Sequence, residues 1–194
     1  SCGEIFDGHK PMPQPYFEDD TPSPLSAYGK SKLESETAVR ENSPNYIILR
    51  SHWIYGIHGH NFIKSLVRWA RQKNPEVMKV PDDEYGSPTW AYRLAVQIQS
   101  LLTNQGRGTY HATANGHCSR FEYAVSVLDK LGIKAPIEAC SIKETDDGYG
   151  PVNYLLENRY SRKQGNDAMV DWEADLDKFL HKHAEDLIKE AEKS

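Results

Sequence analysis

A short apolar run, Tyr46-Ile47-Ile48-Leu49, places the strongest constraint on how this chain folds. A continuous and partly β-branched run of this kind is typical of a strand that is covered on both faces of a parallel sheet. Helical patterns stand on either side of it, with a polar helix predicted over about 25–42 and an amphipathic one over about 61–73. Strands that alternate with helices predict an α/β fold with a parallel sheet.

The rest of the chain continues this alternation. Short strands are predicted at Met78–Val80 and Thr109–Thr113, and helices after Gly86-Ser87-Pro88-Thr89, after Ser119 and over about 171–192. Ser119 and Glu122 have the spacing of a capping box. The helix after Thr89 carries an apolar stripe, and such a stripe normally faces a core. It consists of Ala91, Leu94, Ala95, Ile98, Leu101 and Leu102.

The composition argues against several functional classes. The 194 residues carry 23 Lys and Arg against 28 Asp and Glu, a net charge of −5, so the basic footprint of a nucleic-acid-binding domain is missing. No apolar run approaches the roughly 20 residues that cross a bilayer. Three cysteines without C-x-x-C spacing predict neither a disulfide framework nor a zinc site, and the histidines show no ligand spacing. We expect a cytoplasmic protein with no metal site and no nucleic-acid or membrane partner.

Tyr28 and Lys32 are the most informative residues for chemistry. Four residues apart on the predicted helix, they share one face and can touch the same ligand. A phenol ionises near pH 10 or so, but a neighbouring ammonium favours the phenolate and makes proton exchange with a carbonyl or hydroxyl feasible. The spacing is common by chance, so a surface tyrosine beside a surface lysine remains an alternative on the pair alone.

Ordered motifs over nearly the whole chain add to this pair. They include Ile5-Phe6-Asp7-Gly8, Pro24-Leu25-Ser26-Ala27-Tyr28-Gly29-Lys30-Ser31-Lys32, Leu49-Arg50-Ser51-His52-Trp53-Ile54-Tyr55-Gly56, Asp82-Asp83-Glu84-Tyr85-Gly86-Ser87-Pro88-Thr89 and Asp171-Trp172. Together these motifs closely resemble the extended short-chain dehydrogenase/reductases, and within them most of all the dTDP-4-dehydrorhamnose reductases.

The resemblance implies the C-terminal part of a Rossmann-like doubly wound sheet plus a smaller α/β substrate-binding lobe. Residues 1–54 and 84–114 would be the remnant of the dinucleotide-binding domain, with its N-terminal strands absent, and residues 55–83 and 115–194 the substrate-binding lobe. None of the thirteen glycines makes the glycine-rich turn that seats a pyrophosphate. We therefore expect that a preceding segment of roughly 100 residues, or a second chain, completes the sheet.

The same resemblance implies an NADPH- or NADH-dependent reductase of a dTDP-linked 4-keto-6-deoxysugar, of the type that serves dTDP-L-rhamnose biosynthesis. The sequence gives no indication of Mg²⁺, and a homodimer is compatible with the family. The implied catalytic residues are Tyr28, Lys32 and Cys2, and the implied cofactor contacts are Tyr28, Lys32 and Arg50. The implied substrate contacts are Trp53, Asn61, Phe62, Gly86, Ser87 and Thr89.

Three positions depart from the family pattern. Cys2 stands where the family has a threonine that orients the substrate carbonyl, Gly3 at an aspartate and Glu4 at a tyrosine. A thiol donates only a weak hydrogen bond, and Glu4 adds negative charge near a cleft that accepts a diphosphate. Alternatives therefore stay open: a non-catalytic regulatory or binding subunit of the same fold, or another nucleotide-sugar epimerase or dehydratase. Trp53 could also be a core tryptophan.

Overall fold

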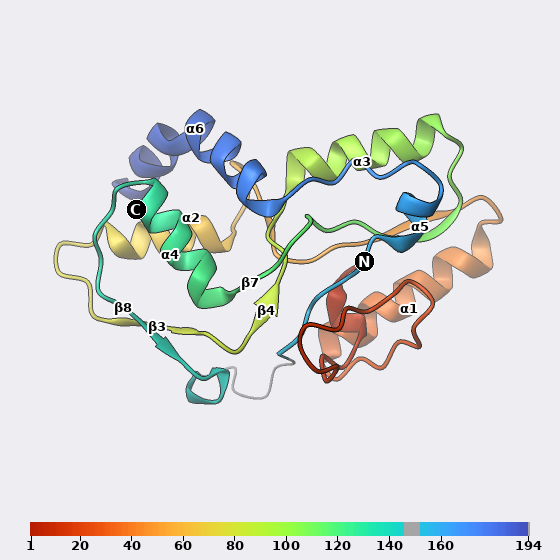
Figure 1. Cartoon of the computed structure of the whole chain (residues 1–194), viewed down its shortest axis with the longest axis horizontal. Helices are drawn as coiled ribbons and strands as arrows, with labels where there is room; N and C mark the ends of the chain where they lie inside the picture. Colours follow the sequence, from red (N-terminus) through yellow and green to blue (C-terminus); the bar gives the residue numbers. More distant parts are fainter. Residues whose placement is uncertain (146–151, 194) are drawn as a thin grey trace.

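The structure is a computed structural model that describes residues 1–145 and 152–193, and strands and helices alternate along it (Figure 1). In chain order the elements are η1 (Gly3–Ile5), α1 (Ala27–Asn42), β1 (Ile47–Arg50), β2 (Ile54–Tyr55), α2 (Phe62–Ala70), β3 (Met78–Pro81), β4 (Tyr85–Gly86), β5 (Thr89–Trp90), α3 (Ala91–Thr103), β6 (Gly108–His111), β7 (Cys118–Ser119), α4 (Arg120–Lys130), β8 (Ile137–Cys140), η2 (Ile142–Glu144), α5 (Arg159–Lys163) and α6 (Trp172–Ala191). In Figure 1, α2, α4 and α6 gather near the C-terminus, whereas α1, α3 and α5 lie at the other end of the molecule.

Most of the strand pairs are parallel. β1 pairs with β6 over four residues, from Ile47 opposite Gly108 to Arg50 opposite His111. β2 pairs with β5 and β3 with β8 in the same sense, and only β4 with β7 is antiparallel among the described strands. Parallel pairs joined through helices confirm the predicted α/β fold.

The second edge of β1 is paired only at its end. The Ser51 amide donates to the carbonyl of Ser1 at 3.3 Å, and Cys2 forms a parallel bridge with Ser51. No described strand pairs with Ile47 or Ile48 on that side. A cleft of about 260 Å³ runs there between β1 and α1, lined by Ser1, Lys32, Ser35, Glu36, Val39, Ile47, Ile48 and Leu49.

One prediction for β1 is wrong. The apolar run was expected to be buried on both faces, yet Ile48 is buried while Ile47 and Leu49 are only half-buried. All three residues line the cleft between β1 and α1, so the side chains of Ile47 and Leu49 are not fully covered by α1.

The main hydrophobic core lies between α2, α4 and α6, where Leu66, Val127, Leu176 and Phe179 are fully buried. Local capping explains where these helices begin. Asn61 and Asp171 accept from the first-turn amides of α2 and α6, and Ser119 makes the predicted capping box of α4 with its partner at the third helical position. A smaller hydrophobic cluster joins η1 to the loop between η1 and α1, and it consists of Ile5, Phe6, Tyr16 and Leu156.

Helix α3 does not bury the apolar stripe that its sequence predicts. Ile98 and Leu102 are 41% and 62% exposed, and only Leu101 of the stripe is fully buried. The side facing the protein also contains Gln97, whose amide donates to the carbonyl of Asn166 at 3.0 Å and accepts from the amide of Ala168 at 2.6 Å. Both polar groups of this buried side chain therefore have partners, as buried amides require, while much of the apolar stripe faces outward.

Candidate functional site

Tyr28 and Lys32 lie side by side on the first turns of α1. The Lys32 ammonium is 5.1 Å from the centroid of the Tyr28 ring, so the two side chains share one face as the spacing predicts. The helix begins here because the Ser26 hydroxyl accepts from the amide of Gly29 at 2.9 Å. Tyr28 is 52% exposed and Lys32 is half-buried, so the phenol is open to a ligand.

The turn η1 packs tightly against the start of α1. A Cβ atom on Gly29 would lie 2.1 Å from the carbonyl oxygen of Glu4, so only glycine permits this approach. The Ser26 hydroxyl donates to Glu4 Oε2 at 3.0 Å and ties the side chains of the two elements together. This contact brings Cys2 and Glu4 next to the helix that carries Tyr28.

Cys2 is 8% exposed, and burial raises the pKa of its thiol. The charge of Lys32 opposes this shift only weakly. A thiol kept protonated is a poor nucleophile. A catalytic role for Cys2 therefore remains a prediction, restricted to weak hydrogen bonding.

Arg50, on β1, pairs with the carboxylate of Glu36 on α1, the helix that carries Tyr28 and Lys32. Its Nε and Nη2 donate to the two oxygens of Glu36, both at 2.8 Å, and its Nη1 donates to the carbonyl of Glu18 at 3.1 Å. Arg50 and Glu36 are each 2% exposed. A cofactor contact from Arg50 stays a prediction, and these bonds weigh against it because they occupy all three nitrogens. Glu36 lies one turn beyond Lys32, so the pair fixes α1 against β1.

Trp53 is held in a conformation that a bulky side chain rarely adopts. Its φ is 46°, in the left-handed region, and its ring is 9% exposed. A Cβ atom on Gly86 would lie 2.7 Å from two atoms of the ring, so glycine is needed there. The guanidinium carbon of Arg120 is 3.7 Å from the ring centroid, and Tyr123 stacks at 6.2 Å. The structure thus brings together Trp53 and Gly86, as the sequence predicts.

The other predicted substrate residues divide into two groups. Phe62 joins the aromatic cluster, with its ring 5.1 Å from the Arg120 guanidinium. Asn61, Ser87 and Thr89 each donate a side-chain hydrogen bond to a backbone carbonyl, at 2.8, 2.6 and 2.9 Å. Ser87 and Thr89 are also buried, so their hydroxyls hold the loop together, and their substrate contacts remain predictions.

Sequence reasoning did not single out four residues that line this region. His52 stacks on Tyr154 at 4.1 Å, and burial, with a smaller effect of Arg120, lowers the pKa of His52 to about 3. Glu84 accepts two hydrogen bonds from Arg120. Glu84 and His52 stand inside the family-like motifs, which could have indicated them. Tyr154 has no sequence signal, because it is placed by the strand contact of its backbone with Tyr85.

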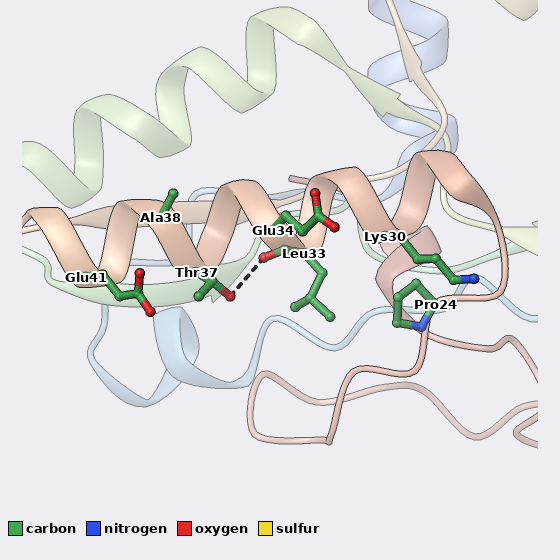
Figure 2. A pocket seen from close by; sticks show the side chains of 7 residues that line it. All are labelled: Pro24, Lys30, Leu33, Glu34, Thr37, Ala38 and Glu41. Atoms are coloured by element: carbon green, nitrogen blue, oxygen red, sulfur yellow. Dashed lines mark hydrogen bonds between the residues drawn. The ribbon is translucent and has the colours of Figure 1, made fainter.

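The groove on the outer side of α1 is a separate feature (Figure 2). It has a volume of about 410 Å³ and is lined by Pro24, Lys30, Leu33, Glu34, Thr37, Ala38 and Glu41. At 100° per residue these helical positions point away from the face that holds Tyr28, Lys32 and Glu36. The groove therefore does not belong to the candidate site.

Two further properties of the described residues concern metal binding and membrane insertion. Among residues 1–145 and 152–193, no three His, Cys, Asp or Glu side chains are placed to hold a metal ion. Within the same part of the chain, every helix is too short or too polar to cross a membrane.

The parallel α/β fold is Rossmann-like, as it is in the solved reductases and dehydratases that it resembles. Residues 1–185 match the family model of the RmlD substrate binding domain, and the chain belongs to that family. It is 38% identical to a dTDP-4-dehydrorhamnose reductase of Sinorhizobium fredii over 68% of this chain and 46% of that protein. It is 36% identical to the reductase of that name from Salmonella typhimurium, over 86% of this chain and 59% of that protein.

The solved structures agree with the sequence relatives. A dTDP-4-dehydrorhamnose reductase from Bacillus anthracis, solved in complex with NADP, superposes with a TM-score of 0.87 at 31% identity, covering 94% of this chain and 64% of that one. The chain thus spans about half to two thirds of the length of the relatives it matches.

Proposed function

We propose that this chain is the substrate-binding and proton-donating part of an NADPH-dependent reductase that acts on a dTDP-linked 4-keto-6-deoxysugar in the formation of dTDP-L-rhamnose. One observation carries the proposal: an exposed phenol on α1 whose ring centroid lies 5.1 Å from the ammonium of Lys32. The family membership supports it, because relatives that share the family carry the name of this reductase.

The residues present fit the nicotinamide end of the cofactor. Tyr28 and Lys32 would hold the nicotinamide ribose, and NADPH, when bound, supplies the hydride. Tyr28 would deliver a proton to the sugar C4 oxygen, with the Lys32 ammonium beside its ring. No glycine-rich turn for the pyrophosphate occurs in these 194 residues, so the diphosphate end of the cofactor must be held elsewhere.

The test is turnover by the native gene product that contains these residues. We expect NADPH oxidation with dTDP-4-dehydro-L-rhamnose and a product that NMR identifies as reduced at C4. An epimerised or dehydrated product, without net NADPH oxidation, would assign the protein to a sister activity instead.

One observation favours a second function, a non-catalytic binding or regulatory subunit. At the position of the family's threonine the structure has the buried thiol of Cys2, which polarises a carbonyl poorly. A stable stoichiometric partner protein, together with no NADPH-dependent change in fluorescence, would support this alternative. The exposed Tyr28 beside Lys32 favours the reductase.

We also propose that a parallel strand completes the sheet at the open edge of β1. Ser1 and Cys2 already run parallel to the end of β1, so residues in front of Ser1, or a strand of a second chain, would continue beside Ile47 and Ile48. The exposed apolar side of α3 would be a second contact surface for the segment or chain that supplies this strand. The amides of Ile47 and Leu49 point to this edge, since the Leu49 carbonyl and the Ser51 amide bond to Ser1 there, whereas the carbonyls of Tyr46 and Arg50 face β6. Hydrogen exchange of the Ile47 and Leu49 amides in the native gene product tests this, with slow exchange expected and fast exchange against it.

Three further parts of the proposal have indirect support. The division into residues 1–54 with 84–114 and residues 55–83 with 115–194 follows the family resemblance. The three cysteines are unpaired, which suits a reducing cytoplasm. A homodimer is compatible with the family and is tested by the mass of the native gene product in solution.

A further inference from the structure

The guanidinium of Arg120, at the start of α4, is fixed from two directions. Its Nε and Nη2 donate to the two carboxylate oxygens of Glu84 at 3.1 and 2.9 Å, and the main-chain amide of Arg120 donates to the carbonyl of Glu84 at 2.9 Å. Its central carbon lies 3.7 Å from the centroid of the Trp53 ring. A fork-shaped pair together with a stacked ring leaves the guanidinium little freedom to rotate.

One edge of this guanidinium stays free. Nη1 donates to no described residue, and the Arg120 side chain is 18% exposed. Trp53 also has a donor without a partner, Nε1, but that atom is buried and the residue is only 9% exposed. Of the two side chains, Arg120 is therefore the more open to a ligand.

The charges around Arg120 connect it to the Tyr28 side of the site. Its positive charge acts on His52 and Tyr154, and the pKa of Tyr154 is raised mainly by burial and further by Glu84 and Glu4. Glu4 in turn touches the start of α1 through Ser26. Contacts join the two regions, because a Cβ atom on Gly3 in η1 would lie 3.5 Å from His52, and the His52 ring lies 6.2 Å from the ring of Trp53.

We infer that Arg120 is a specificity-determining residue that donates hydrogen bonds from Nη1 to a neutral oxygen of the bound sugar. This inference rests on the proposed function. An arginine has donors and no acceptor, so it selects a hydroxyl or carbonyl oxygen. Glu84 neutralises the charge of the guanidinium, which favours an uncharged sugar oxygen over the diphosphate. Trp53 then supports Arg120 from behind and does not itself form the sugar platform.

Calorimetric binding to the native gene product and its Arg120→Lys variant tests the inference. Lysine keeps the positive charge but loses the fork and the planar contact with Trp53. With dTDP-L-rhamnose as the probe we expect binding to weaken about 10- to 100-fold, the effect of losing a hydrogen bond to a charged donor. With dTDP alone, and with NADPH, we expect less than about a twofold change. Arg107→Lys, at an exposed arginine, is the matched control and should leave all three affinities unchanged.

The outcomes separate the possibilities. Equal weakening for dTDP and dTDP-L-rhamnose, or no weakening for either, overturns the inference. If Arg120→Lys fails to fold by circular dichroism, Glu84→Gln serves instead, because it frees the guanidinium and should weaken only the sugar probe. If wild-type protein binds dTDP-L-rhamnose, and Arg120→Lys weakens that binding, but the keto sugar is not reduced, the proposed reductase activity is rejected and the inference about Arg120 stands. Wild-type protein that binds no dTDP-L-rhamnose would reject both.

Discussion

Glu36→Ala is expected to cost the protein a large part of its stability. The substitution removes the carboxylate that accepts two hydrogen bonds from Arg50 at 2.8 Å, at a place where both residues are 2% exposed. The Arg50 guanidinium then keeps only its bond to the carbonyl of Glu18. Two hydrogen bonds between charged groups contribute about 1.5–3 kcal/mol each, and leaving a buried charge without its partner costs about 3–5 kcal/mol. We therefore expect the free energy of unfolding to fall by about 3–5 kcal/mol.

Urea denaturation followed by far-ultraviolet circular dichroism measures this loss. Glu34→Ala, at an exposed glutamate on the same helix, is the control and should change stability by less than about 0.5 kcal/mol. Replacing both partners, Glu36→Leu with Arg50→Met, should recover much of the lost stability because no charge remains buried. A loss in Glu36→Ala no larger than in the control would refute the reasoning.

The same carboxylate makes a prediction about pH. Burial would raise the pKa of Glu36, but Arg50, together with the Ser1 amino group and Arg40, outweighs it and holds the pKa below the usual 4.5. Its stabilising contribution is therefore complete above pH 4.5 and is lost as the pH falls through the lower folded-state pKa. Glu36→Ala should flatten this part of the stability profile.

Three further substitutions are expected to have measurable effects. Burial, aided by Arg50, lowers the pKa of His111 to about 3, so between pH 7 and 5 the unfolded state takes up a proton at this residue and stability should fall by about 2 kcal/mol on its account; His111→Gln should reduce the fall by that amount in urea titrations at the two pH values and leave the share of His52. Gly86→Ala should destabilise by about 1–3 kcal/mol and change the near-ultraviolet circular dichroism, because its methyl group would meet the Trp53 ring; an unchanged spectrum would contradict this contact. Arg93→Met should cost about 3–5 kcal/mol in thermal or urea unfolding because it strands a fully buried carboxylate on α6, and a change near zero would argue against the pair.

The helices were predictable because their signals are local. The polar pattern and the Ser26 cap placed α1 within two residues of its observed start, and Ser119 with Glu122 marked the start of α4. The helix predicted over about 61–73 is shorter, Phe62–Ala70, because the sequence pattern continues beyond the last helical hydrogen bonds.

Burial was harder to predict than secondary structure. The apolar stripe of α3 gives no warning that Gln97 faces the protein, because its partners are the distant backbone groups of Asn166 and Ala168. Similarly, the half-buried state of Ile47 depends on what lies beside β1, which the run itself does not specify.

The candidate site likewise contains a part that the sequence predicts and a part that it does not. Tyr28 and Lys32 could be predicted because one helix fixes their separation. The contact between Arg120 and Trp53 joins segments that are far apart in the sequence, and no local pattern reports it. The ion pair of Arg93 with Asp175 on α6 also joins distant segments, and no local pattern predicts it.

The rate of NADPH-dependent reduction of dTDP-4-dehydro-L-rhamnose by the Tyr28→Phe variant of the native gene product tests the central claim most directly. Phenylalanine keeps the ring that faces Lys32 and removes the hydroxyl that would donate the proton, so we predict a loss in kcat of about 100-fold or more. Tyr92→Phe, at another exposed tyrosine, should react at the wild-type rate. A Tyr28→Phe enzyme as fast as Tyr92→Phe would contradict the role assigned to the phenol.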